Sequence, residues 1–124
     1  MILILGGAFQ GKIDFARRRF GFGDDDISIC RDADLDFSKP CIAHLEEFVY
    51  HSLRNGADPL ELLMENRQLI SNTVIICEDI FCGVVPMERE LRLWRDATGK
   101  ICQYLSRESE EVYRIFCGLE QKLK

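Results

Sequence analysis

The sequence predicts an α/β domain in which a mainly parallel sheet lies between two layers of helices. The 124 residues contain short apolar runs without polar alternation, which is typical of parallel strands covered on both faces. Segments with helical spacing separate these runs. We therefore predict one domain, residues 1–124, with its ligand site at the carboxyl ends of the strands. The predicted strands are residues 1–5, 27–30, 73–77 and 112–117.

The first helix predicted from apolar periodicity follows the second of these strands. Asn55 and Gly56 supply a C-terminal stop for it. A shorter helix is predicted over residues 13–17, directly after a glycine-rich stretch. The apolar residues at helical spacing in the longer segment are Ile42, Leu45, Phe48, Val49 and Leu53.

Two more helices are predicted in the second half of the chain. Asp58 suits an N-cap, Pro59 suits the first turn, and the Glu61 side chain can reach back as in a capping box. The other helix is long and is expected to end near Ser106. Its predicted buried stripe consists of Leu91, Trp94, Thr98, Ile101 and Leu105.

The glycine-rich stretch behind the first predicted strand has the pattern of a phosphate loop. Gly6, Gly11 and Lys12 match the sequence Gly, four residues, Gly, Lys, then Ser or Thr. The backbone N–H groups of such a loop, the following helix N-terminus and the lysine all bind phosphate oxygens. The strand, loop and helix order predicts a P-loop NTPase-like three-layer sandwich. Its predicted nucleotide-binding residues are Gly6, Gly7, Ala8, Phe9, Gln10, Gly11, Lys12 and Ile13.

Ile13 is the departure from this pattern. A phosphate loop normally coordinates magnesium through a Ser or Thr hydroxyl at that position, and isoleucine has no lone pair to offer. Asp14 follows by one residue and is expected to point elsewhere on the helix. We therefore expect weakened magnesium binding and assign no metal ligand.

Two adjacent carboxylates, Glu78 and Asp79, come directly after the third predicted strand. Many P-loop proteins place a carboxylate there that assists magnesium or a reacting hydroxyl. Neighbouring side chains cannot point the same way, so one is expected to face the site and the other to cap a helix or loop. Alternatively, both simply end the strand. The predicted catalytic residues are Asp79, Glu78 and Lys12.

Several later segments follow the glycine-rich loop in a fixed order, namely Gly83-Val-Val-Pro86, Arg92-Leu-Trp-Arg-Asp96, Gly99, Gln103 and Val112 to Gly118. Together with that loop, they resemble the adenosylcobinamide kinase/adenosylcobinamide-phosphate guanylyltransferase family of cobalamin biosynthesis. The resemblance covers about the first 20 residues and the chain from about residue 73 onward. It implies a P-loop α/β fold that uses ATP or GTP to phosphorylate a cobinamide hydroxyl and then transfers GMP. It also aligns Asp79 with a family glutamate and Glu78 with an asparagine.

The chain departs from this family in the segment that carries the guanylylated histidine. Residues 31–39 leave little room for that segment, and His44 and His51 lie farther on, in a predicted helix. Neither histidine is expected to inherit the nucleophile role, so guanylyltransferase activity is predicted to be lost. Two hypotheses remain: a kinase-like enzyme acting on a cobinamide-like hydroxyl, or a non-catalytic nucleotide-binding or assembly module.

Net charge and the length of the apolar runs limit the classes of partner that we expect. A net charge of −5 argues against a broad nucleic-acid surface, which needs basic patches. The N-terminal apolar run is too short for a signal peptide or a membrane span, so we expect a cytoplasmic protein without membrane partners. Oligomeric state, including a homo-oligomer, is left open. The runs of Arg17 to Arg19 and Asp24 to Asp26 are interpreted as a solvated face and a polar turn.

The six cysteines are expected to be reduced thiols. Cys30, Cys77 and Cys117 end apolar runs and could gather near the phosphate loop as a thiol cluster or soft-metal site. The favoured alternative is that they pack as small buried hydrophobes.

Overall fold

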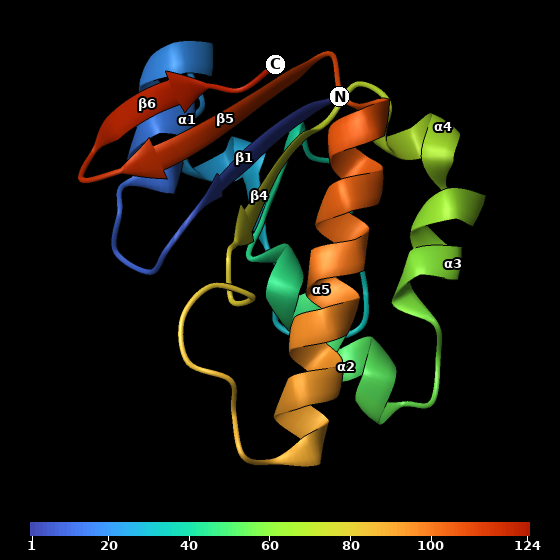
Figure 1. Ribbon diagram of the computed structural model, residues 1–124. Coiled ribbons are helices and arrows are strands. Elements are labelled where there is room, and N and C mark those ends of the chain that lie inside the picture. Colours follow the sequence, from blue (N-terminus) through green and yellow to red (C-terminus); the bar gives the residue numbers. More distant parts are fainter.

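A six-stranded sheet forms the centre of the molecule in the computed structural model, which describes residues 1–124 (Figure 1). Its strand order is β2-β3-β4-β1-β5-β6, and every neighbouring pair is parallel except the β5–β6 hairpin. The predicted P-loop-like α/β sandwich with a mainly parallel sheet is therefore confirmed. The strands are β1 (Ile2–Gly6), β2 (Ile27–Ile29), β3 (Cys41–Ala43), β4 (Val74–Glu78), β5 (Glu111–Phe116) and β6 (Leu119–Lys122).

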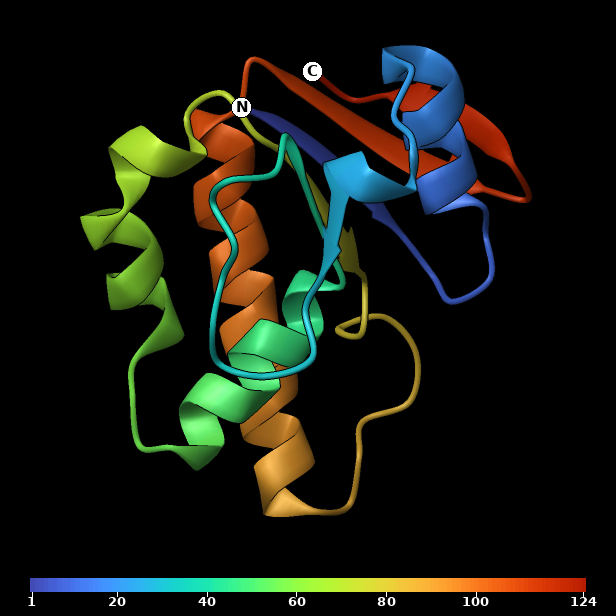
Figure 2. The same cartoon turned by 180° about the vertical axis from the view of Figure 1, so that it is seen from behind.

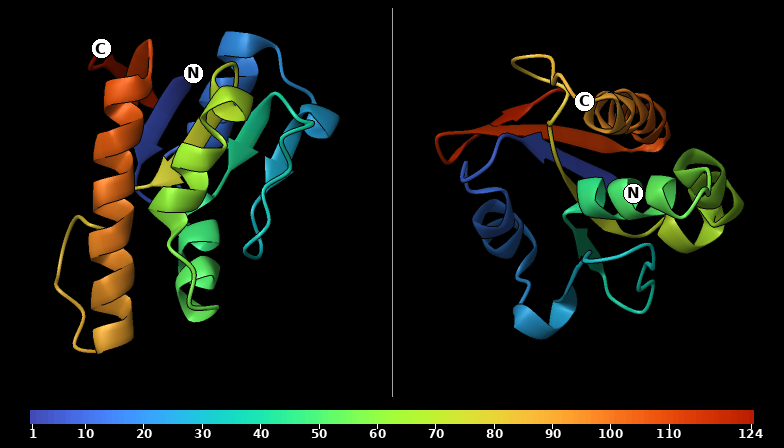
Figure 3. Two further views of the ribbon diagram at one scale, coloured as in Figure 1. Left: turned by 90° about the vertical axis from the view of Figure 1, so that its right-hand side faces the viewer. Right: turned by 90° about the horizontal axis from the view of Figure 1, so that it is seen from below.

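Helices cover both faces of this sheet, as the views from behind, from the side and from below show (Figures 2 and 3). Helix α1 (Lys12–Phe20) packs on one face, followed by the short 3₁₀ turn η1 (Asp24–Asp26). The other face carries α2 (Leu45–Arg54), α3 (Pro59–Glu65), α4 (Arg67–Ile70) and α5 (Arg89–Glu108). No helix is both long enough and apolar enough to cross a lipid bilayer.

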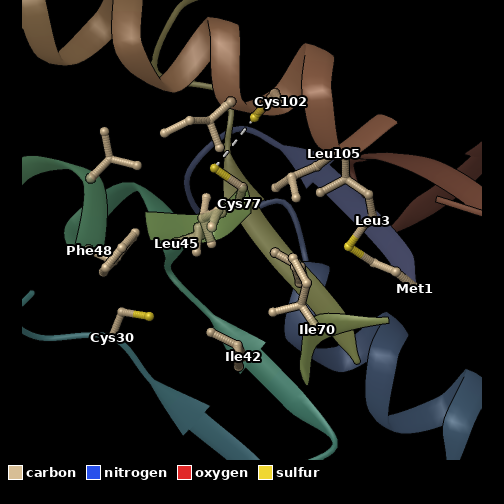
Figure 4. Close-up of a cluster of buried hydrophobic side chains, with 14 of the residues drawn as sticks. Met1, Leu3, Cys30, Ile42, Leu45, Phe48, Ile70, Cys77, Cys102 and Leu105 are labelled. Carbon is tan, nitrogen blue, oxygen red and sulfur yellow. Dashed lines mark hydrogen bonds between the residues drawn. The ribbon is translucent and has the colours of Figure 1, made fainter. Parts of the chain in front are cut away.

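Successive strand residues serve two separate cores. Leu3 and Ile75 are paired in register and lie in the core under α2 to α5, part of which is drawn in Figure 4. Their successors Ile4 and Ile76 lie in the core under α1. Both faces of the central strands are thus buried, which is why these strands read as continuous apolar runs.

The four predicted strands are confirmed, but β3 and β6 were not predicted. Ile42 belongs to β3, and α2 begins only at Leu45. A buried strand of three residues is too short to show its own pattern of apolar residues. Ile42 therefore fits the helical spacing of the following residues by coincidence. Strand β6 has only exposed residues and therefore no alternating pattern to detect.

The predicted helix boundaries are close to those observed. Asn55 caps α2, and Gly56 follows with a positive φ of 75°. The Asp58 carboxylate caps α3, because it accepts hydrogen bonds from the backbone N–H groups of Leu60 and Glu61. Glu61 takes part in this cap through its backbone N–H. Helix α5 ends at Glu108, two residues beyond the expected Ser106.

The three cysteines that end apolar runs do not gather. Cys30 and Cys77 are buried in the core, whereas Cys117 is exposed in the β5–β6 turn. Burial raises the pKa of the Cys30 thiol to about 12. The sulfur atoms of Cys77 and Cys102 lie 3.7 Å apart inside the core (Figure 4). These buried thiols pack as small apolar side chains.

Candidate functional site

The predicted phosphate loop connects β1 to α1 at the carboxyl edge of the sheet. In Figure 1 it leaves the same edge as the long connection from β4 to α5. Gly11 has a φ of 93°, a conformation that favours glycine, and Lys12 then opens α1. The backbone N–H groups of Ala8 and Phe9 donate to no acceptor in the protein. They are therefore available to an anionic ligand.

The β5–β6 turn fastens this loop. The Gln10 side-chain oxygen accepts a hydrogen bond from the Cys117 backbone N–H at 2.7 Å, and the Gln10 carbonyl accepts one from the Gly118 N–H at 2.9 Å. At Gly6, an added Cβ would lie 2.5 Å from the Ile115 carbonyl oxygen. The first glycine of the motif is thus required by the approach of β5, a role that the motif alone did not reveal.

Lys12 is folded back over the loop. Its Nζ donates a 2.6 Å hydrogen bond to the Gly7 carbonyl, and the residue is only 7 % exposed. The ammonium group is thereby held at the loop without a carboxylate partner within ion-pair distance. This arrangement leaves its charge available to an incoming phosphate.

A pocket of about 420 Å³ opens beside the loop. It extends from the loop to the end of β4, which neighbours β1 in the sheet, and to the residue that follows β3, the next strand along. The wall of the pocket contains several predicted nucleotide-binding residues and the acidic residues Asp14 and Glu78. The lining residues are Ala8, Phe9, Gln10, Gly11, Lys12, Ile13, Asp14, His44, Ile76 and Glu78.

The two adjacent carboxylates take different positions. Glu78, the last residue of β4, lines the pocket, and burial raises the pKa of its carboxyl group, helped by the negative charge of Glu46. Asp79 lies outside that wall. Its N–H donates to the Gly6 carbonyl at 3.1 Å, and its Oδ1 would be 3.7 Å from a Cβ added at Gly7. Both carboxylates therefore border the phosphate loop, from different sides.

The pocket offers a limited oxygen set for magnesium. Ile13 lines it with an aliphatic side chain that also packs against the core under α1. Asp14, which was expected to point elsewhere, is part of the wall. No cluster of three or more histidine, cysteine or acidic side chains suited to a metal ion is present. The donor groups fit a phosphate better than a fully protein-coordinated cation.

His44 and Glu46 are the site residues that sequence reasoning missed. His44 was expected inside a helix, but it stands between β3 and α2 and lines the pocket. Its Nδ1 lies 2.8 Å from a carboxylate oxygen of Glu46, which is 2 % exposed. Residues two apart meet here because the chain changes from strand to helix at position 44, and no sequence pattern marks that change. His51 lies on α2 instead, 3.8 Å from Glu47.

Comparison with protein families gives a match. The model of the cobinamide kinase / cobinamide phosphate guanyltransferase family matches residues 42–123, which is more than half of the chain. The chain belongs to this family. No curated protein matches the chain.

The matched range extends the resemblance stated from the sequence. It contains the segments from residue 73 onward and also α2 and α3, but it begins within β3, after the predicted phosphate loop. Membership places the chain in a family of kinase and transferase enzymes of cobalamin biosynthesis. The predicted phosphate loop lies outside the matched range and stays a prediction.

Proposed function

We propose that the protein binds ATP or GTP at its phosphate loop and transfers a phosphoryl group to a cobinamide-like hydroxyl. The observation that carries this proposal is the shared pocket of Lys12 and Glu78 in a member of this kinase family. Loop N–H groups and Lys12 would hold the phosphates, while Glu78 stands where an acceptor hydroxyl can reach it. We propose that the protein carries out this reaction in the cytoplasm.

The chemistry asks mainly for positioning and charge stabilisation. The acceptor oxygen forms a bond to the terminal phosphorus as the bond from that phosphorus to the bridging oxygen breaks. The hydroxyl proton passes to a carboxylate, and the nucleoside diphosphate leaves. Burial raises the pKa of Glu78 and so makes it a stronger base than an ordinary carboxylate. Asp79, on the other side of the loop, is the second candidate for this proton.

We further propose that guanylyl transfer is lost. The family's histidine-bearing segment should follow β2, but residues 30–40 of this chain form turns and bends without a helix. The pocket histidine, His44, comes after β3 and is bonded to a buried carboxylate. It therefore differs in position from the nucleophile that the resemblance implies.

A non-catalytic nucleotide-binding or assembly module is the second candidate. The observation that favours it is Ile13, which presents carbon atoms to the pocket where a phosphate loop normally presents a hydroxyl. A poorer metal site would lower the rate of transfer before it lowered binding. The two candidates therefore share the nucleotide site and differ in turnover.

One pair of measurements separates them. ATP and GTP binding is measured by calorimetry with and without magnesium, and phosphate transfer from labelled nucleotide to cobinamide is measured under the same conditions. We expect binding in both conditions and slow transfer. Firm binding without transfer to any cobinamide acceptor would favour the module, and absence of binding would contradict both candidates.

A further inference from the structure

The imidazole of His44 has no role in the function proposed above, yet the fold holds it at the pocket in an uncommon backbone conformation. His44 has a φ of 59° and a ψ of 48°, which lie in the left-handed region that asparagine, aspartate and histidine adopt more often than other residues with a Cβ. Its side chain is 41 % exposed and lines the pocket with Lys12 and Glu78. The ring is therefore placed where it can contact a ligand bound in the pocket.

The buried Glu46 carboxylate fixes the orientation of the ring. One of its oxygens lies 2.8 Å from His44 Nδ1, and the other accepts the Glu78 backbone N–H at 2.8 Å. The Glu46 carbonyl accepts a hydrogen bond from the Trp94 indole at 2.7 Å, which ties this turn to α5. Because a carboxylate accepts at Nδ1, that nitrogen carries the hydrogen, and Nε2 is left for a ligand.

The negative charges around the pocket outnumber the single positive charge of Lys12, so a second cationic group would help to bind an anionic ligand. Asp14 and Glu78 line it together with Lys12, and Glu46 stands behind His44. One lysine cannot balance these carboxylates and a polyphosphate chain as well. The hydroxyl that would help to hold a neutralising magnesium ion is replaced by Ile13.

We propose that His44 is a second phosphate-binding side chain of this pocket, which donates a hydrogen bond from Nε2 as an imidazolium. This inference rests on the proposed binding of a nucleotide at Lys12. Glu46 acts as a positioning residue, since it touches the ligand only through His44. Such a charge-assisted bond is short and stronger than a neutral one.

The protonation of His44 sets the expected pH dependence. The hydrogen bond that His44 donates to Glu46 raises the pKa of His44, burial and the charge of Lys12 act in the opposite direction, and the charge of Glu78 adds to the increase. The imidazolium binds phosphate and the neutral ring does not. The extra affinity is therefore complete below the raised pKa and is lost as the pH rises through it.

The test uses His44→Asn, because asparagine tolerates the left-handed backbone and carries no charge. His51→Asn, on the exposed part of α2, is the matched control. Affinity for ATP and GTP is measured without magnesium at about pH 6 and about pH 8.5, on either side of the ordinary histidine pKa. Comparison with the variant removes the effect of the ligand's own titrating phosphate.

We expect His44→Asn to weaken binding roughly tenfold at the lower pH and to behave like the wild type at the higher pH. His51→Asn should match the wild type at both. Glu46→Gln keeps an acceptor for the Glu78 N–H but removes the charge, so the loss of affinity should shift to lower pH. A purely structural role for Glu46 would not move this profile.

The outcomes separate this inference from the proposed function. If the wild type binds nucleotide and His44→Asn binds equally well over the whole pH range, the role of His44 is overturned while the nucleotide site stands. If the wild type binds neither ATP nor GTP at any pH, both are overturned. An imidazole ¹⁵N spectrum of His44 that does not change on addition of ATP to a binding-competent protein would also contradict the contact.

Discussion

Lys12 Nζ donates a hydrogen bond to the Gly7 carbonyl at 2.6 Å, so the charged end of the motif closes back onto its own loop. The side chain needs only to exchange this acceptor for a phosphate oxygen. Because the lysine lies at the first turn of α1 and is almost fully buried, its position is fixed before a ligand arrives. This preorganisation lowers the entropy cost of binding.

Lys12→Ala is expected to weaken ATP and GTP binding by roughly tenfold to a hundredfold, the usual loss for a charge-assisted hydrogen bond. The measurement is calorimetry on both proteins, with circular dichroism to check the fold. Lys39→Ala, which removes an exposed lysine bonded to the Asp25 carbonyl, serves as the control. Unchanged nucleotide affinity in Lys12→Ala would rule out the phosphate-loop interpretation.

Ile13→Thr is expected to increase the effect of magnesium on nucleotide affinity. The threonine hydroxyl restores the missing ligand at a position that already lines the pocket. Affinities with magnesium and with a chelator are compared in the wild type and the variant. If the wild type already depends on magnesium as strongly as the variant does, another group holds the ion.

The variants Glu78→Gln and Asp79→Asn distinguish the roles of the two neighbouring carboxylates. Removal of the general base is expected to reduce phosphoryl transfer to cobinamide by about a hundredfold or more, with little change in nucleotide affinity. The alignment implied by the family resemblance favours Asp79, whereas the pocket wall contains Glu78. The rates of both variants are compared with that of the wild type. Equal rates in all three proteins would reduce both residues to structural roles.

Labelled GTP is expected to leave no covalent GMP on the chain. The histidine-bearing segment of the family has no helical counterpart after β2, and the Nδ1 of His44 is engaged by Glu46. Intact-mass spectrometry after incubation provides the measurement. An acid-labile GMP adduct on His44 or His51 would show that guanylyl transfer is retained at a shifted position.

Gly6→Ala is expected to lower the free energy of unfolding by about 1–3 kcal/mol, because the new Cβ would meet the Ile115 backbone oxygen. Gly99→Ala is the matched control, since a Cβ there makes only ordinary contact with Phe81 at 3.8 Å. Alanine also favours the interior of α5 by about 1 kcal/mol over glycine. Urea unfolding of both variants tests this contrast. A Gly6→Ala protein as stable as the wild type would show that β5 can move away.

The sequence by itself determined the α/β class and the long strands, and it is the basis on which the loop after β1 is predicted to bind phosphate. Strands β1 and β4 are buried on both faces, so their residues must be apolar without interruption, and that constraint is visible in the letters. That prediction rests on the fixed spacing of glycines and a lysine, which phosphate binding by such loops requires. The caps at Asp58 and Gly56 were equally local, since each serves its own helix end.

Tertiary structure alone decided which side chains share the pocket. β3 is three residues long and runs directly into α2, so the turn that brings His44 onto Glu46 has no local signature. Glu46 is stable in the core only because the end of β4 supplies the Glu78 N–H and because His44 supplies a second donor. The contact between Glu46 and the Glu78 N–H joins positions 32 residues apart. These contacts depend on the order of strands in the sheet, which pairwise long-range packing sets and which local spacing does not encode.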